Sequence, residues 1–342
     1  MAATVIDEER AMDDDPKSMR AMTHKAYGRP EERRVLDLSD VDVPVPEDDQ
    51  VLVRVHASSV NPVEWYGVTG PYFARVGAGF RKPSYPGVGA DLAGVVEAVG
   101  GEVEGFRPGD EIYGSGNGAW AEYAVARASR IARKPANVSF EEAATVPIAG
   151  LTALQALRDH GHVEPGQRVL INGASGGVGT FAIQLAKAFG AEVTAVCSTS
   201  NVEQARALGA DRVVDYTTED FTTLGIRHHV FLDIAGRRSF LDCRRALEPD
   251  ATFVLVGGKM TYRGLGPLPH LAGTMMKSRF RSQTTTFFVA KVNTEDLDLM
   301  RDLIEAGKVS PVVERTYPLD EAFDALSYLG EGHAHGKVVI TV

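Results

Sequence analysis

The chain has 342 residues, of which 44% are hydrophobic and 24% are charged. This length favours two domains of about 150 residues each, and the composition excludes a wholly disordered chain. The formal net charge of −10 argues against nucleic acid as the main partner, because a negative surface repels phosphate backbones. No apolar run reaches the ~18 residues of a membrane span, so we expect no membrane partner.

The chain contains only two cysteines, Cys197 and Cys243, which are far apart. This excludes a disulfide framework and a cysteine-built zinc site, and it favours a reducing, cytoplasmic location. Residues 1–22 are rich in Asp and Glu and have no apolar core of a signal peptide. We expect a mobile acidic tail there, with a partner-binding peptide as the alternative.

The first part of the chain, to about residue 140, has an all-β pattern. Alternating apolar residues predict strands at 51–57, 92–99 and 120–126. Residues 67–89 form a long Gly- and Pro-rich passage with several aromatic side chains. Loops of that length are usually functional.

The pattern changes at Ser139, which with Glu142 has the spacing of a helix capping box. Short apolar runs then alternate with helix-length segments, which predicts βαβ units and a parallel sheet. The expected strands are 168–172, 192–196, 212–215, 229–234 and 251–256, and the expected helices are 149–160, 178–189 and 202–208. After about residue 294 we expect helices at 295–306 and 319–329 and a final strand at 337–342.

The strongest chemical signal lies between the strand 168–172 and the next helix. Gly176 and Gly179 occupy the last two glycine positions of a G-x-G-x-x-G motif, and Ala174 replaces the first. Backbone N–H groups at a helix N-terminus bind pyrophosphate where no side chain obstructs them. The loop therefore predicts a dinucleotide site formed by Ser175, Gly176, Gly177, Val178 and Gly179.

The residues after the second strand of this unit bear on which dinucleotide binds. An NAD site usually places Asp or Glu about 20 residues beyond the loop, but this chain has Ser198, Thr199, Ser200 and Asn201 there. These side chains, with Tyr216, favour NADP(H), although no Lys or Arg stands among residues 198–201. NAD stays an alternative, as does the simpler interpretation that Ser198 and Thr199 cap the following helix.

The order of the motifs resembles the medium-chain dehydrogenase/reductase superfamily, in its zinc-free quinone oxidoreductase-like branch of NADPH:quinone and enoyl reductases. The segments that carry the resemblance are Ser59-Val-Asn61-Pro62, Gly89-Ala-Asp91-Leu-Ala-Gly94, Phe106-Arg-Pro-Gly-Asp110, Trp120-Ala-Glu-Tyr123, Gly150-Leu-Thr152, the glycine loop, Leu208-Gly-Ala-Asp211 and Gly336-Lys-Val-Val-Ile340. The resemblance implies an α/β fold in which a GroES-like β-rich catalytic domain (23–142 and 291–342) is split around a Rossmann doubly wound parallel-sheet domain (143–290).

The zinc-dependent branch of this superfamily has a Cys ligand in the region of Ser58 and Ser59 and a His-Glu pair in the region 89–91. Neither is present here. The close histidine pairs at 160/162, 228/229 and 333/335 lack carboxylate or thiolate company, and we expect them in surface loops. The prediction is a site without metal.

By the resemblance, Asn61, Tyr66 and Tyr72 line the substrate cleft, and Tyr72 matches a proposed proton donor. Alternatively, Tyr66 is a core aromatic and Asn61 bonds backbone around its own turn. Glu64 and Trp65 are predicted to be packing or surface residues.

The resemblance also implies contacts to the nicotinamide half of the cofactor from Thr152, Gly257, Gly258, Phe287 and Phe288. The two phenylalanines have an equal alternative as ordinary buried strand aromatics. Lys337 is expected to be a solvated strand lysine, with an approach to the cofactor as its alternative.

Hydride addition to an electron-poor carbon needs positioning and an oxyanion stabiliser more than a metal. We therefore expect hydride transfer from NADPH to a small-molecule quinone or α,β-unsaturated carbonyl, by a homodimer joined at Rossmann edge strands. Three alternatives stay open. The first is a 2-enoyl thioester reductase with a tunnel along 73–85 and 265–280, where Lys277, Arg279 and Arg281 could meet phosphates. The others are a reductase of specialised metabolism and a non-catalytic NADPH-binding scaffold or sensor.

Overall fold

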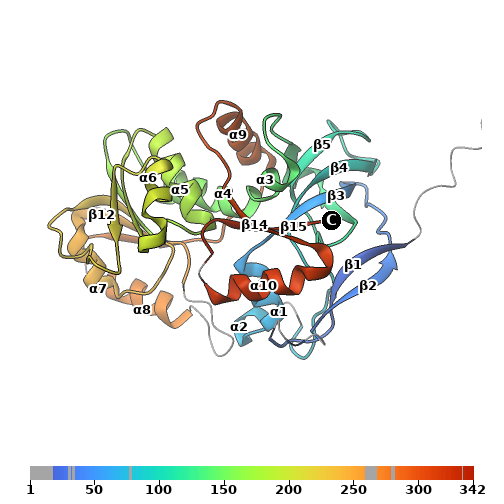
Figure 1. The fold of residues 1–342 in the computed structure, drawn as a ribbon, viewed down its shortest axis with the longest axis horizontal. Coiled ribbons are helices and arrows are strands. Elements are labelled where there is room, and N and C mark those ends of the chain that lie inside the picture. Colours follow the sequence, from blue (N-terminus) through green and yellow to red (C-terminus); the bar gives the residue numbers. More distant parts are fainter. Residues whose placement is uncertain are drawn as a thin grey trace, which may run out of the picture.

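The computed structural model describes residues 18–29, 32, 35–76, 79–258, 268–278, 282–332 and 334–342. These residues form two large sheets and a small hairpin, with helices packed around and between the sheets (Figure 1). Among them, no helix combines the length and apolarity needed to cross a lipid bilayer.

The first large sheet has six parallel strands in the order β10-β9-β8-β11-β12-β13. Its strands are β8 (Arg168–Asn172), β9 (Glu192–Cys197), β10 (Arg212–Asp215), β11 (His228–Asp233), β12 (Leu247–Leu255) and β13 (Thr284–Phe287). The chain order reverses between β8 and β11, so the carboxyl ends of these strands border a crevice of the kind that binds ligands in doubly wound sheets. The predicted parallel Rossmann sheet is confirmed.

The second large sheet is built from both ends of the chain. Its strands are β3 (Gln50–Val60), β4 (Asp91–Val99), β5 (Glu111–Ser115), β6 (Tyr123–Arg127), β7 (Ile131–Arg133), β14 (Val313–Pro318) and β15 (Lys337–Thr341). β15 pairs antiparallel with β3, so Val338 lies opposite Val60 and Ile340 opposite Ser58. This pairing brings the last residues of the chain beside residues almost 280 positions earlier.

The predicted boundary of the acidic tail at residue 22 is wrong. Ser18–His24 forms strand β1, which pairs antiparallel with β2 (Leu36–Asp42). Met19 and Ala21 are buried against Ala121, and these apolar contacts order a segment that the neighbouring acidic residues led us to group with the tail. Residues 1–17 lie outside the described part of the chain.

Helices surround the two sheets. Their bounds are α1 (Pro62–Thr69), α2 (Tyr72–Arg75), η1 (Ala128–Arg130), α3 (Phe140–Ala144), α4 (Pro147–Gln155), η2 (Ala156–His160), α5 (Gly177–Ala188), η3 (Thr199–Asn201), α6 (Val202–Ala207), α7 (Phe240–Cys243), η4 (Arg244–Ala246), α8 (Leu268–Ser278), α9 (Thr294–Glu305), η5 (Leu319–Glu321) and α10 (Ala322–Glu331). The capping box at α3 is present, since Ser139 Oγ accepts from Glu142 N at 3.2 Å and Glu142 Oε2 accepts from Ser139 N at 2.8 Å. The predicted helix 149–160 is α4 continued by a π-helical turn, η2.

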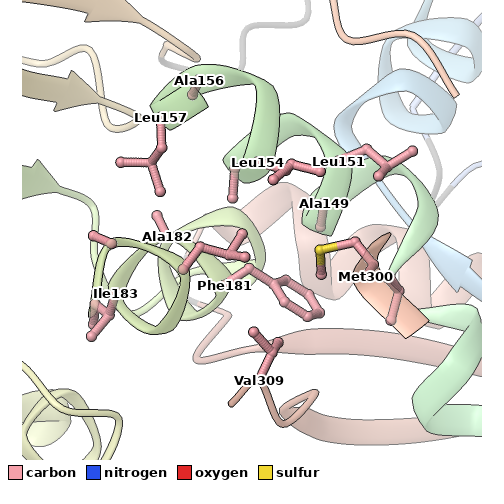
Figure 2. Packing of buried hydrophobic residues seen from close by; sticks show 14 of the residues in the cluster. Ala149, Leu151, Leu154, Ala156, Leu157, Phe181, Ala182, Ile183, Met300 and Val309 are labelled. Atoms are coloured by element: carbon pink, nitrogen blue, oxygen red, sulfur yellow. The ribbon is translucent and has the colours of Figure 1, made fainter. Parts of the chain in front are cut away.

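The largest apolar core packs α4 against α5 and α9. Leu151, Leu154, Phe181 and Met300 are fully buried there and interdigitate between these helices (Figure 2). This contact fixes the first turn of α5, which follows the glycine loop, relative to α4.

Candidate functional site

The glycine loop joins the carboxyl end of β8 to the first turn of α5. Gly173 has a positive φ of 91°, which favours glycine. A Cβ at Gly179 would collide with the carbonyl oxygen of Gly173 and lie 2.6 Å from the backbone of Ala174. The glycine positions predicted from the motif therefore reflect a backbone that folds tightly on itself.

The N-terminus of α5 has no side-chain cap. Gly176 is the N-cap residue with an extended backbone, and Ser175, Gly176, Gly177 and Val178 are half-buried. Uncapped N–H groups at the start of a twelve-residue helix, unobstructed by side chains, suit an anionic phosphate. The residues present thus fit the pyrophosphate of a dinucleotide.

The hydroxyl-rich segment after β9 lies beside a carboxylate that the sequence analysis missed. Thr199 Oγ1 donates to Asp215 Oδ2 at 2.5 Å, and Asp215 Oδ1 accepts from the amide of Thr217 at 2.9 Å. These hydrogen bonds, that from Thr199 first, lower the pKa of Asp215. The pattern of NAD sites predicts such an acidic residue about 20 positions beyond the loop, whereas Asp215 lies at the end of the neighbouring strand, β10.

The other side chains of this segment are arranged around Ser198. Its hydroxyl lies 3.2 Å from Ser200 Oγ and accepts from Asn201 Nδ2 at 2.9 Å. Tyr216, which follows Asp215 in the sequence, is 55% exposed. Ser198 makes no side-chain cap bond, the hydroxyl of Thr199 bonds Asp215 and Thr217, and the N-cap residue of α6 is Asn201, so the interpretation that Ser198 and Thr199 cap this helix is wrong.

A fully buried charged cluster lies on the other side of the loop. We use the name buried charge cluster for Asn61, Glu64, Asp91 and Lys337, all of which are at most 6% exposed. They come from the N-terminus of α1, from β4 and from β15. The pairing of β15 with β3 assembles them.

Asp91 is the centre of the buried charge cluster. It accepts hydrogen bonds from Ser59 Oγ at 2.6 Å, Asn61 Nδ2 at 2.9 Å and the amide of Ile148 at 3.0 Å. Its Oδ2 lies 3.8 Å from the ammonium of Lys337. Burial raises the pKa of Asp91, and the charge of Lys337 counteracts this rise.

Lys337 is 4% exposed, so the expectation of a solvated strand lysine is wrong. Its ammonium donates to Asn61 Oδ1 and to the carbonyl oxygen of Val60. Burial lowers its pKa, and the charges of Asp91 and Glu64 counteract this. The side chain points inward because Val338, the next residue, packs on the opposite face of β15 in another core.

Glu64 is buried at 6% exposure, so of the two predicted settings, packing or surface, it has the first, and its carboxylate is hydrogen-bonded there. Its Oε2 accepts from the amide of Asn61 at 2.8 Å and its Oε1 from the amide of Ala90 at 3.0 Å. Burial raises the pKa of Glu64 to about 8, and the negative charge of Asp91 contributes to this shift. Trp65 is also buried, at 1% exposure, as predicted for a packing residue.

The three predicted catalytic residues have different surroundings. Asn61 is 2% exposed, and both ends of its amide are engaged by Lys337 and Asp91. It also forms a capping box with Glu64 at the start of α1, as the alternative of a bond around its own turn expected. Tyr66 in α1 is half-buried, with edge-to-face contacts to Trp65 at 5.4 Å and to Phe73 at 5.2 Å. Burial raises its pKa.

Tyr72 begins α2 and is 60% exposed. The guanidinium of Arg75 lies 5.8 Å from its ring and 4.6 Å from the ring of Tyr27. Because Phe73 of α2 contacts Tyr66 of α1, the two helices that carry Tyr66 and Tyr72 lie next to each other. The structure thus places α2 and the last turn of α1 inside the passage 67–89 that the sequence indicated as a loop.

The predicted nicotinamide contacts are divided between two places. Thr152 is half-buried in α4, and Gly257 and Gly258 follow the carboxyl end of β12, where the amide of Gly257 donates to Asp233 O at 3.3 Å. Phe287 is 43% exposed, so it is not a buried strand aromatic. Phe288 stacks on His160 with 4.1 Å between ring centroids and lines a cavity of about 680 Å³ together with Arg158.

The predicted histidine pairs and the region of the expected zinc ligands have defined surroundings. His228 is buried, and its ring nitrogens lie 3.0 Å from Ala246 O and from Thr194 Oγ1, so its expected place in a surface loop is wrong. Within the described ranges no three His, Cys, Asp or Glu side chains are grouped to hold a metal. The hydroxyls of Ser58 and Ser59 donate to Asp91, which also has a lysine ammonium beside it, and this donor set does not fit zinc.

Some predictions lie outside the described residues. They concern His333, Arg279, Arg281 and both ends, 265–267 and 279–280, of the segment 265–280 proposed for a thioester tunnel. The middle of that segment is helix α8, in which the side chain of Lys277 is not described.

Comparison with known proteins identifies the family. Residues 47–136 match the alcohol dehydrogenase GroES-like domain, and residues 208–340 match the zinc-binding dehydrogenase family. A 2-methylene-furan-3-one reductase of Solanum lycopersicum is 36% identical over 340 residues, covering 95% of this chain and 79% of that protein. A chloroplastic NADPH-dependent alkenal/one oxidoreductase of Arabidopsis thaliana is 35% identical, covering 95% and 80%.

A solved structure agrees with these matches. The quinone oxidoreductase from Coxiella burnetii superimposes with a TM-score of 0.82 at 29% identity, covering 95% of this chain and 100% of that one. The two-sheet fold, the glycine loop and the full-length relatives point the same way. The chain belongs to the medium-chain dehydrogenase/reductase superfamily, in its quinone oxidoreductase-like branch.

Proposed function

We propose that this protein is an NADPH-dependent oxidoreductase that reduces quinones or α,β-unsaturated carbonyl compounds. The observation that carries the proposal is the uncapped N-terminus of α5, which follows a loop so tight that a Cβ at Gly179 would collide with Gly173. The names of the relatives, an enone-type furanone reductase, an alkenal/one oxidoreductase and a quinone oxidoreductase, support this substrate class.

The chain's own residues would divide the work as follows. Residues 175–179 bind the pyrophosphate, residues 198–201 with Tyr216 face the adenosine ribose, and Thr152, Gly257 and Gly258 face the nicotinamide. The bound dinucleotide supplies the hydride. We place Phe287 and Phe288 at the edge strand β13, on the side away from the nicotinamide, because the ring of Phe288 packs on His160.

A carbonyl oxygen that gains negative charge needs a hydrogen-bond donor and then a proton. Tyr72 is exposed enough to reach a substrate, and Tyr66 lies on the adjoining helix with its hydroxyl in a partly apolar setting. We assign the proton to Tyr72 and the orientation of the acceptor to Tyr66. Asn61 is a positioning residue, since its amide is already used inside the buried charge cluster.

The assembly and the domain division are part of the proposal. β13 is an edge strand of the six-stranded sheet, and Phe287 and Val289 beside it are 43% and 77% exposed. A second copy pairing there would cover them, which supports a homodimer. The pairing of β15 with β3 supports a GroES-like domain of residues 18–142, which includes the whole of β1, and 291–342, around a Rossmann domain of residues 143–290. A cytoplasmic location stays a prediction.

The test is the loss of NADPH absorbance with purified protein and a panel of quinones, enones and enoyl thioesters, with matched NADH and chelator-treated samples. Oxidation of NADPH by quinones or enones, unaffected by the chelator, is the expected result. Binding of NADPH without turnover of any acceptor would contradict the proposal and favour a scaffold or sensor.

A further inference from the structure

Lys337 touches the glycine loop as well as the buried charge cluster. A Cβ on Gly177 would lie 2.7 Å from Lys337 Cδ and 3.4 Å from its Cγ, so the aliphatic part of the lysine packs directly on the first residue of α5. The far end of the same side chain bonds Asn61, the N-cap residue of α1, and the carbonyl of Val60. One side chain therefore spans from the loop to α1.

The partner of this lysine extends the connection to a third helix. Asp91 lies 3.8 Å from the ammonium and accepts from the amide of Ile148, in the first turn of α4. α4 carries Thr152, and α1 carries Tyr66. The helices that carry the residues assigned to nicotinamide and substrate are thus both connected to a side chain that rests on the phosphate loop. α1 is connected by a hydrogen bond to its N-cap residue, and α4 by an ion pair and a hydrogen bond through Asp91.

The stability of the fold by itself does not explain why the pair of Lys337 and Asp91 is buried. A buried ion pair is often no more stabilising than apolar residues of the same volume, because both charges lose their hydration. A long charged side chain that is fully buried, packed on Gly177 and bonded to an N-cap residue fits a positioning role better. The absence of a Cβ at Gly177 is also what leaves room for the lysine stem.

We propose that Lys337 is a positioning residue that couples the phosphate loop to α1, so that nucleotide binding at the start of α5 orders the helix that carries Tyr66. The proposal rests on the function proposed above, because it takes a dinucleotide as the ligand of the loop. Lys337 does not contact the reacting atoms. It acts through Asn61.

The test is hydrogen–deuterium exchange of the full-length protein with and without NADP⁺, read separately in residues 61–72 and 173–181. At NADP⁺ about 100 times its Kd, exchange at the start of α5 should slow by up to about 100-fold. In the wild type, α1 should also become slower, by about 5-fold or more. In K337M the protection of α5 should remain and that of α1 should be lost.

Removal of one charge of a buried pair can unfold a protein, so a second variant accompanies the first. D91N/K337M removes both charges and should fold while still lacking the protection of α1. The exposed lysine at 308 provides a matched control, and K308M should behave as the wild type. Turnover gives a second readout: in both Lys337 variants kcat should fall by about 10- to 100-fold, with a much smaller change in the Kd of NADP⁺.

The outcomes are distinguishable. Protection of α1 that persists in D91N/K337M, or wild-type protection confined to α5, would overturn the coupling while leaving the proposed function intact. If NADP⁺ protects neither segment of the wild type, the cofactor site itself is wrong and the coupling falls with it.

Discussion

The glycine loop and the buried charge cluster lie in contact, yet they are built on opposite principles. In the proposed function the loop would bind phosphate through backbone N–H groups, and it depends on the absence of side chains at its glycines. The cluster depends on four polar side chains held out of water by β3, β4, β15 and α1. A loop of the first kind can be recognised from a few consecutive residues. A cluster of the second kind exists only where distant strands meet.

The largest effect is expected from a side chain placed inside the loop. Gly179→Val should abolish detectable NADPH binding, because its Cβ would collide with Gly173 O and force the loop open. Binding is measured by calorimetry and folding by circular dichroism. Gly273→Ala is the control, since no atom lies within 4 Å of its Cβ position. Tight NADPH binding by Gly179→Val would show that the loop is not the phosphate site.

The corresponding change in the cluster should affect stability before binding. Asp91→Asn leaves the Lys337 ammonium buried without its nearest counter-charge and should cost about 3–5 kcal/mol of unfolding free energy. Urea denaturation measures this cost. D91N/K337M should recover most of the loss, whereas equal losses in the two variants would mean that the charges do not interact.

The titration of Glu64 gives the cluster a pH dependence that the loop lacks. Its pKa of about 8 in the folded protein lies above the ordinary value of 4.5, so the folded state keeps a proton that the unfolded chain releases. This contribution to stability is complete below pH 4.5 and is lost as the pH rises through about 8. Glu64→Gln should flatten the fall in Tm across this window. An unchanged Tm profile would show that Glu64 ionises normally.

Substitution of Tyr72, which is exposed, tests whether this residue is the proton donor. Tyr72→Phe should lower kcat with an enone by about 10- to 100-fold, less than a full general-acid loss, because water can reach this position. The Kd of NADPH serves as the control and should not change. A variant with wild-type kcat would move the proton donor elsewhere, and Tyr66→Phe would be measured next.

The smallest effect concerns the adenosine end of the loop. Asp215 places a negative charge beside Thr199, where a 2′-phosphate would lie in the proposed complex. Asp215→Asn should therefore improve kcat/KM for NADPH relative to NADH by about a few-fold. A shift toward NADH instead would place the 2′-phosphate away from Asp215.

Elements with a local signal could be predicted from the sequence. The capping box at Ser139, the parallel strands and the glycine loop each depend on residues only a few positions apart, and the fold and family followed from their order. β1 was missed because its alternation is short and follows a strongly acidic segment. α2 was missed because its single turn lies in a passage rich in glycine and proline.

The sequence by itself determined the glycine loop and the start of α5, because tight turns and helix starts are set by neighbouring residues. It could not determine that Lys337 is buried, since its surroundings depend on the register between β15 and β3. Nor could it place Asp215 beside Thr199, because that contact needs β9 and β10 to lie next to each other. Only the tertiary structure decided these environments, and a buried charge takes its chemistry from whatever the fold brings within a few ångströms of it.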